Sequence, residues 1–380
     1  MKIFLSFLQG KPDHPIPAYS FWEYYIKNGI EESGNSWVEA PAVDWAFGLV
    51  PQSKESFQRW KEDTWKKTIS YLKKNRVDLF LSYLYPAQID ADSIKEIKKM
   101  GIPCVNFFCD HIREFRQIPN EFGVFDLSWV PEYQAQQMYK KQGFRYIHLP
   151  MPMWVDYKYR SVPEHESTNI AFIGSKDVQR QLFFERFVKL NSNIEIDIYG
   201  TGWEDKESST HCFQKQSLYE KLINQKDFIR KNGIYAFKNK ILYSGKQENL
   251  SLELKELVKP KPDFENYIRI TRESRIVLGI NRYPGYNYPI HKPNTYSRLR
   301  DIEAPMLGAC YLTEFTPGLE SMYEIGKEIE VFSNQEELIE KLKHLQQEPG
   351  KRKNLRMNAQ QKALNTLSIP SSILKIKSSL

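Results

Sequence analysis

Long apolar runs are missing from this sequence of 380 residues, since none approaches the ~20 residues that a membrane-spanning helix needs. The opening residues MKIFLSFLQG hold too short an apolar stretch for a signal peptide, and they lack a small-residue cleavage site. We therefore expect a soluble, cytoplasmic protein without a transmembrane segment. The sequence leaves peripheral contact with a membrane open.

Cysteine is scarce as well. The chain has four cysteines, at Cys104, Cys109, Cys212 and Cys310. They show neither the CxxC spacing typical of a zinc site nor the pattern of a disulfide framework. All but Cys212 lie in apolar, strand-like runs, which indicates small core residues and fits a reducing compartment.

Charge of one sign is nowhere concentrated. The 54 lysine and arginine residues exceed the 47 aspartate and glutamate residues to give a net charge of +7. No stretch forms a basic arm, so we expect no nucleic-acid partner; the excess fits an anionic ligand or a lysine-rich surface. No GxGxxG fingerprint follows the first strand, and no acidic residue is placed for a Rossmann ribose. These absences count against an NAD-dependent dehydrogenase or an epimerase.

Strand-like and helix-like segments alternate along the chain. Apolar runs of strand length occur at 2–8, 77–83, 102–108, 125–130 and 146–149, and again at 169–173, 193–199, 275–280, 309–312 and 328–332. Amphipathic segments separate many of these runs. The alternation predicts an α/β fold with two doubly wound, Rossmann-like domains, and 380 residues are long for a single core.

The proline-flanked segment 150–163 is the predicted linker. We expect an N-terminal domain at 1–155, a second domain at 165–348, and a C-terminal helix and tail at 349–380. Residues 204–264 are polar and irregular apart from a strand-like 240–243 and a helical 251–258. They predict an insertion within the second domain.

The stretch 294–320 organises the second domain. Leu299, Ile302 and Met306 recur at three and four positions, which predicts a helix with one apolar face. Gly308 follows, and glycine commonly ends a helix where positive φ is needed. An apolar run of strand length comes next. The sequence therefore predicts a helix and then a short strand.

Two polar features of this stretch are candidate ligand contacts. Arg300 and Glu303 lie three positions apart, on the helix face away from the apolar one. A carboxylate there could take both hydroxyls of a ribose, whereas the alternative is a solvated surface ion pair. After the strand, Pro317, Gly318 and Leu319 form a turn that opens the next helix, and its N–H groups are candidates to face phosphate.

Residues at the ends of the other second-domain strands complete the candidates for holding a diphosphate. They are Gly174, Ser175, Lys176, Arg180, Gly200, Gly202 and Arg282. The turn at 174–177 opens a helix with two nearby cations, although a solvated helix start is the alternative. The glycines after the strand at 193–199 allow close approach of a ligand or simply a tight turn.

Asp110 and His111 follow the strand at 102–108, where α/β enzymes place working groups. Aspartate can act as a general base or can orient a histidine that does so. The alternative is an aspartate that caps the next segment beside an exposed histidine. Asp90 and Asp92 precede a helix, so we expect them to cap it and not to bind a metal.

A family resemblance extends these observations. The segment RLRDIEAPMLGACYLTEFTPGLE, with the strand at 328–332 and the helix NQEELIEKLKHL, resembles the carboxyl-terminal signature of group-1-type glycosyltransferases. It is most similar to the spore-maturation, CgeB-like branch, whose pattern is roughly Arg-x-x-Glu-Ala, Gly, strand, Thr-Pro-Gly-Leu-Glu. The resemblance implies the GT-B architecture: two Rossmann-like domains face a cleft, and a C-terminal helix crosses back to the first domain.

The resemblance also implies an activity and roles for residues. The activity is metal-independent transfer of a sugar from a nucleotide sugar to a hydroxyl acceptor, without a further cofactor. Glu303 would hold the ribose, Arg300 would orient it, and the turn at 174–180 with the Gly318 loop would hold the diphosphate. Asp110, alone or with His111, would deprotonate the acceptor if configuration inverts, and the two would only position the sugar if it is retained. The family usually has Asp-Asp there, and His111 departs from it. A second hypothesis is a catalytically silent relative that binds a nucleotide sugar and acts as a scaffold in surface-polymer assembly.

Overall fold

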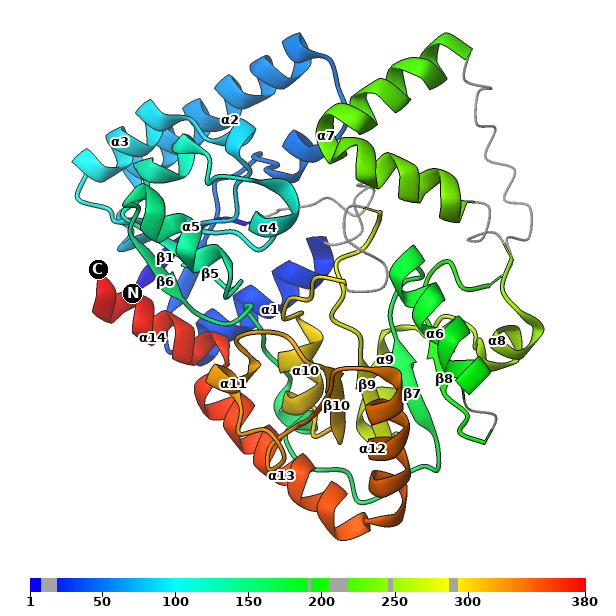
Figure 1. The fold of residues 1–380 in the computed structure, drawn as a ribbon. Coiled ribbons are helices and arrows are strands. Elements are labelled where there is room, and N and C mark those ends of the chain that lie inside the picture. Colours follow the sequence, from blue (N-terminus) through cyan, green and yellow to red (C-terminus); the bar gives the residue numbers. More distant parts are fainter. Residues whose placement is uncertain (8–18, 191–192, 205–217, 245–248, 287–292) are drawn as a thin grey trace. The chain divides into compact units, whose positions relative to one another are not determined.

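The computed structural model describes residues 1–7, 19–190, 193–204, 218–244, 249–286 and 293–380. The chain forms two compact units (Figure 1). Unit 1 comprises Met1–Tyr157, Ser297–Met306 and Gln361–Leu380, and unit 2 comprises Lys158–Tyr296 and Leu307–Gln360. Residues 297–306, which the sequence placed in a second domain, thus group with unit 1.

The described strands of unit 1 form a six-stranded sheet in the order β2-β1-β3-β4-β5-β6, with all neighbours parallel. The strands are β1 Lys2–Ser6, β2 Ser36–Val38, β3 Leu79–Ser82, β4 Cys104–Phe107, β5 Leu127–Val130 and β6 Tyr146–His148. The helices are α1 Tyr19–Glu32, α2 Lys54–Lys74, α3 Ala91–Lys99, α4 His111–Glu114, α5 Ala135–Gln142, α10 Arg300–Met306 and α14 Ile369–Ser379. Strands β3, β4 and β5 are buried along their whole length, as parallel strands covered on both faces are.

The described strands of unit 2 form a five-stranded sheet in the order β11-β10-β9-β7-β8, also parallel throughout. The strands are β7 Ile170–Ile173, β8 Asp197–Tyr199, β9 Ile276–Gly279, β10 Tyr311–Glu314 and β11 Glu330–Phe332. The helices are α6 Val178–Leu190, α7 Leu218–Ser244, α8 Leu252–Leu257, α9 Phe264–Glu273, α11 Leu319–Met322 and α12 Gln335–Gln347. Helix α13, Pro349–Thr366, begins in this unit.

The strand order reverses in both sheets. In unit 1 the chain passes from β1 to β2 on one side and then to β3 on the other, and in unit 2 it passes from β7 to β8 and then to β9. This doubly wound order confirms the fold class predicted from the sequence. In such sheets ligands bind outside the carboxyl ends of the strands at the reversal, which in unit 2 lies between β7 and β9.

Several predicted helix ends are confirmed. The Asp90 carboxylate accepts a hydrogen bond of 3.0 Å from the Ser93 N–H and so caps α3. Gly143 ends α5 with φ of 72°, and Gly308, with φ of 75°, follows α10. Helix α6, Val178–Leu190, begins directly after the turn at 174–177 as predicted. These outcomes follow from short-range rules, since each cap depends on neighbouring residues alone.

Two helices correct the sequence-based prediction for the insertion. Residues 240–243, predicted as strand-like, lie in α7, because so short an apolar run does not distinguish strand from helix. Helix α9, which follows the proline-rich loop, was not predicted from the sequence. Asp263 caps this helix by accepting a 2.8 Å hydrogen bond from the Asn266 N–H. Residues 205–217 and 245–248 of the predicted insertion lie outside the described residues.

The end of the chain packs on the first helix within unit 1. A Cβ added at Gly29 of α1 would lie 2.6 Å from the Cβ of Ile369 in α14, so glycine permits this close contact. The Ile369 N–H also donates to the Met153 carbonyl at 3.0 Å. The return of the C-terminal helix to the first domain is therefore confirmed. The predicted tail is wrong in one respect, because α14 occupies it.

Arg356 of α13 joins several chain ends in unit 2. Its guanidinium is 3% exposed and donates to the carbonyl oxygens of Arg272 at 2.7 Å, Ser274 at 2.6 Å and Gly308 at 2.8 Å. A further donor reaches Glu166 at 3.3 Å. These carbonyls lie at the end of α9 and after α10, just before the paired strands β9 and β10. Arg356 therefore carries an unusual share of the local hydrogen bonding.

We expect Arg356→Met to lower the free energy of unfolding by about 3 kcal/mol, because buried carbonyls and a carboxylate lose their donor. Urea unfolding followed by circular dichroism measures this change. Arg186→Met is the matched control, since Arg186 pairs with Glu336 at 3.1 Å on the exposed surface. Such a pair contributes roughly 1 kcal/mol or less. Equal losses for both variants would contradict the assignment.

Candidate functional site

The turns after β7 and β8 contact each other at the carboxyl edge of the unit 2 sheet. The Gly174 N–H donates to the Tyr199 carbonyl at 2.8 Å, and the Lys176 N–H donates to the Thr201 carbonyl at 2.9 Å. Gly200 has φ of 132°, and a Cβ there would lie 2.3 Å from the Gly174 carbonyl oxygen. The structure therefore brings together the two predicted glycine turns. Gly200 is explained by this contact without any ligand.

A carboxylate of the chain already occupies the start of α6. Asp177 Oδ1 accepts hydrogen bonds from the N–H groups of Gln179 at 2.8 Å and Arg180 at 3.1 Å. The Arg180 guanidinium donates to the Ser175 carbonyl at 2.8 Å and lies 3.6 Å from Asp177 Oδ2. The amides predicted to face a diphosphate are thus capped by Asp177. An anion that binds at this turn must displace that carboxylate or use other donors.

Arg282 lies in a buried ion pair just beyond β9. Its Nε donates to Glu314 Oε1 at 2.8 Å, and the Asn281 N–H donates to Glu314 Oε2 at 3.3 Å. The guanidinium lies over the Phe183 ring at 4.6 Å. Burial raises the pKa of Glu314, and the charge of Arg282 works against that rise. The predicted cation is therefore held by Glu314, and Asn281 holds Glu314 in turn. The sequence did not predict either residue as part of the site.

The glycine loop after β10 has the predicted conformation. Gly318 has φ of 101° and stands directly before α11. Its N–H donates to Glu320 Oε2 at 3.1 Å, while Pro317 is exposed and Leu319 is fully buried. The backbone donor expected for phosphate is thus engaged by a nearby carboxylate. Leu319 contributes to the core.

Helix α10 carries Glu303 on a buried face, although the sequence placed this residue only on the face away from the apolar one. All residues from Asp301 to Met306 are buried, and Glu303 is 2% exposed. The hydroxyl of Tyr25 in α1 donates to Glu303 Oε1 at 2.6 Å within unit 1. The alternative of a solvated surface ion pair is wrong, because the Glu303 carboxylate is buried. Arg300 is half-buried at the start of the helix.

His111 is fully buried, so the alternative of an exposed histidine is wrong. Its Nδ1 lies 3.0 Å from Glu132 Oε2 and its Nε2 lies 3.0 Å from the Tyr139 hydroxyl. Glu132 Oε2 also accepts hydrogen bonds from the N–H groups of His111 at 2.6 Å and Ile112 at 3.3 Å. Glu132, and not Asp110, therefore caps the start of α4.

Asp110, in contrast to His111, keeps 18% of its side chain exposed. Its carboxylate lies 3.4 Å from Arg113 Nη2. Burial raises the pKa of Asp110; Arg113 opposes the rise, and the charges of Glu132 and Glu114 add to it. Of the two predicted catalytic residues, Asp110 is thus the one with access to solvent. Its role, like the roles of the other predicted site residues, stays a prediction.

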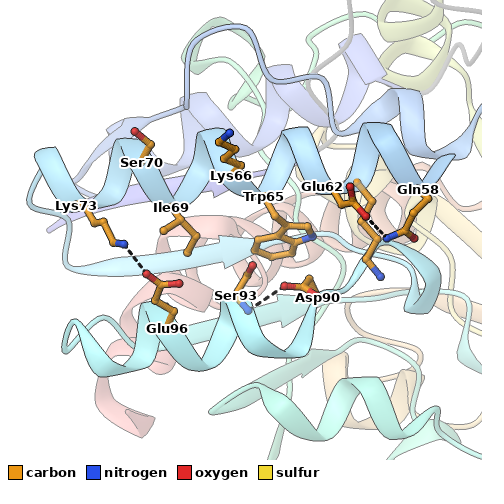
Figure 2. A pocket seen from close by; sticks show the side chains of 11 residues that line it. Gln58, Glu62, Trp65, Lys66, Ile69, Ser70, Lys73, Asp90, Ser93 and Glu96 are labelled. Carbon is orange, nitrogen blue, oxygen red and sulfur yellow. Dashed lines mark hydrogen bonds and ion pairs between the residues drawn. The ribbon is translucent and has the colours of Figure 1, made fainter. Parts of the chain in front are cut away.

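A groove of about 600 Å³ lies between α2 and α3 in unit 1 (Figure 2). Trp65 and Ile69 point from α2 toward α3, and an ion pair of 2.7 Å joins Lys73 to Glu96. Its lysines are matched by acidic side chains along the same groove. The lining therefore favours neither an anionic nor a cationic ligand. Asp90 lines it only as the cap of α3.

Two general features concern metals and membranes. Among the described residues, no group of three histidine, cysteine, aspartate or glutamate side chains is arranged to hold a metal ion. The helices of the described chain include none with the length and apolarity required to cross a bilayer.

Comparison with known proteins gives a family match in the carboxyl-terminal third. Residues 244–369 match the family model described as glycosyl transferase-like. The match runs from the end of α7 to the start of α14 and includes Arg282, Glu303 and Gly318. The chain has no match among curated protein sequences.

Solved structures match over the whole chain. A glycosyltransferase from Rickettsia africae ESF-5 has 13% identity and a TM-score of 0.60, with 100% of this chain and 98% of that chain covered. HepE of Anabaena in complex with UDP-glucose has 12% identity and a TM-score of 0.56, with both chains covered fully. A sucrose-phosphate synthase from Thermosynechococcus elongatus has 10% identity and a TM-score of 0.55, with 99% and 98% covered. The fold is therefore that of GT-B glycosyltransferases.

Proposed function

We propose that this protein is a glycosyltransferase that moves a sugar from a nucleotide-sugar donor to a hydroxyl group of an acceptor. The observation that carries the proposal is the glycosyl transferase-like match over residues 244–369, on a chain with the GT-B fold. HepE, which shares this fold, is described in complex with UDP-glucose. Within the glycosyltransferases we place the chain nearest the CgeB-like branch, on the motif Arg300–Glu320.

We assign the ribose and the diphosphate of the donor to different residues. Glu303 accepts hydrogen bonds from the two ribose hydroxyls, and Arg300 adds positive charge beside it. Arg282, Lys176, Arg180 and the Gly318 N–H bind the diphosphate. Cations and backbone amides that face a leaving diphosphate stabilise its developing charge, so the proposed reaction needs no metal.

The chemical step follows from these roles. The acceptor oxygen forms a bond to the anomeric carbon while the bond from that carbon to the diphosphate oxygen breaks, and the diphosphate leaves with the electron pair. In an inverting reaction the Asp110 carboxylate takes the proton of the acceptor hydroxyl. In a retaining reaction Asp110 positions the sugar instead. His111, buried between Glu132 and Tyr139, supports the segment that presents Asp110.

We expect one class of nucleotide sugar among UDP-, GDP-, ADP- and dTDP-sugars to raise the melting temperature of the protein. A ligand at 100 times its Kd stabilises the native state by about 2.7 kcal/mol, which corresponds to a rise of several degrees. Differential scanning fluorimetry over this panel measures the shift. The corresponding free sugars are the control and should leave the melting temperature unchanged.

A transfer assay then separates an enzyme from a binding protein. Release of nucleoside diphosphate in the presence of hydroxyl acceptors supports the proposed activity. Binding without hydrolysis or transfer of any donor would instead support the silent, scaffolding relative. If none of the nucleotides shifts the melting temperature, the proposal itself is contradicted.

A further inference from the structure

Strands β9 and β10 are neighbours in the sheet of unit 2 (Figure 1). Hydrogen bonds around one buried carboxylate join the ends of these two strands. Glu314, the last residue of β10, is 4% exposed, and both of its oxygens accept hydrogen bonds, from Arg282 Nε at 2.8 Å and from the Asn281 N–H at 3.3 Å. The Asn281 side chain donates back to the Glu314 carbonyl at 3.0 Å and to the Thr313 hydroxyl at 3.1 Å. The position of Arg282 relative to the sheet is therefore fixed at several points.

Stability alone does not account for this arrangement. A buried ion pair stabilises a fold little more than apolar residues of the same volume, because two charges lose their hydration. Glu314 is the charged residue at the end of the fully buried strand YLTE, and Leu312 of the same strand belongs to the core. The main effect of a carboxylate at this position is to orient the guanidinium group of Arg282. The Phe183 ring, 4.6 Å from the guanidinium, restricts that direction further.

A second arginine lies within the electrostatic reach of the same carboxylate. The charge of Arg180, on α6 after β7, acts together with that of Arg282 to lower the pKa of Glu314 against the effect of burial. Two arginines near each other repel, and a shared carboxylate offsets that repulsion. They lie where β7 and β9 flank the reversal of strand order, the place where ligands bind in such sheets.

We infer that Glu314 is a positioning residue, which holds Arg282 at the sheet edge in the orientation that receives the diphosphate of the donor. The inference rests on the proposed function, since it concerns the same donor. Arginine recognises phosphate through a planar fork of N–H donors, so its orientation matters more than its charge alone. Glu314 contributes that orientation through Nε and does not itself touch the ligand.

The test measures binding of the nucleoside diphosphate and of the corresponding nucleoside by calorimetry. Glu314→Gln keeps the shape of the side chain but weakens its bond to Arg282, so we expect diphosphate affinity to fall about tenfold or more. Nucleoside affinity should not change, a pattern that general loss of structure would not produce. Glu330→Gln is the matched control: Glu330 is a 4% exposed glutamate in the same sheet, held by Lys341 at 2.6 Å.

A double-mutant cycle with Arg282→Gln completes the test. If Glu314 acts through Arg282, the double variant binds no more weakly than Arg282→Gln alone. Additive losses, or an unchanged affinity in Glu314→Gln, would overturn the inference while leaving donor binding by the wild type intact. Absence of nucleotide binding by the wild type would contradict the proposed function before any variant is compared.

A second variant decides the matter should Glu314→Gln not fold. Arg282→Lys retains the charge but not the Nε–H that Glu314 holds. A positioning role predicts that Arg282→Lys loses as much diphosphate affinity as Arg282→Gln. Retention of wild-type affinity by Arg282→Lys would overturn the inference, because charge without orientation would then suffice.

Discussion

The Glu303→Gln variant is expected to bind its nucleotide about 100-fold more weakly than the wild type, a change of about 2.7 kcal/mol. Glutamine preserves the volume of this buried side chain but presents an amide NH₂ where a ribose hydroxyl needs an acceptor. Hydrogen bonds to a charged group contribute about 1.5–3 kcal/mol each, so the loss of one or two accounts for the effect. Calorimetric titration with the nucleotide found by the thermal-shift screen measures it.

Deoxynucleotides make the test specific for the ribose. The wild type should prefer a ribonucleotide to its 2′-deoxy and 3′-deoxy counterparts, and Glu303→Gln should lose that preference. Tyr25→Phe is the matched control, because it removes the 2.6 Å hydrogen bond to Glu303 but leaves the carboxylate in place. A Glu303→Gln variant that still discriminates among the three nucleotides would refute the assignment of the ribose to this residue.

Asp110→Asn should lower kcat by about 10³-fold if the reaction inverts configuration, in the range that a positioned general base contributes. Donor affinity should stay at the wild-type value, because the residue acts on the acceptor hydroxyl. Steady-state kinetics together with donor titration measures both quantities. The matched control is Glu114→Gln, a second carboxylate beside Arg113, 3.1 Å from its Nε. That variant should retain most of the activity.

The same residue predicts how activity depends on pH. A general base works only when it is ionised, so activity rises as pH passes upward through its pKa. Burial raises the pKa of Asp110, and the charges of Glu132 and Glu114 act in the same direction. The acidic limb of the kcat profile should therefore lie above the range usual for aspartate, and Asp110→Asn should abolish it. A limb that persists in the variant would assign it to another group.

Short-range patterns in the sequence predicted much of the fold. The cap at Asp90, the start of α6 and most of the buried strands depend on nearby residues, and these agree with the structure. The strand predicted at 193–199 is shorter, since β8 begins at Asp197. The strand predicted at 240–243 failed because a four-residue apolar run has no period to measure. Helix α9 was missed because the prolines before it obscured the cap that Asp263 provides.

Long-range contacts explain why the site was predicted less completely. The sequence placed His111 at a strand end, but its partners Glu132 and Tyr139 lie 21 and 28 residues away. For Glu303 the sequence left a ligand contact and a solvated ion pair open, and its buried partner Tyr25 lies 278 positions away. Local sequence patterns do not indicate contacts between residues so far apart in the chain. One sequence signal could have identified Glu314 as the partner of Arg282. That signal is a charged residue at the end of a buried strand.

The carboxylates of Asp177 and Glu320 already satisfy the backbone amides at two of the predicted anion contacts. Because each is tethered a few atoms from its amide, it competes at a high effective concentration. A phosphate that binds at either turn must displace such a tethered carboxylate and therefore gains little. These two carboxylates would thus exclude weakly bound inorganic phosphate from both turns.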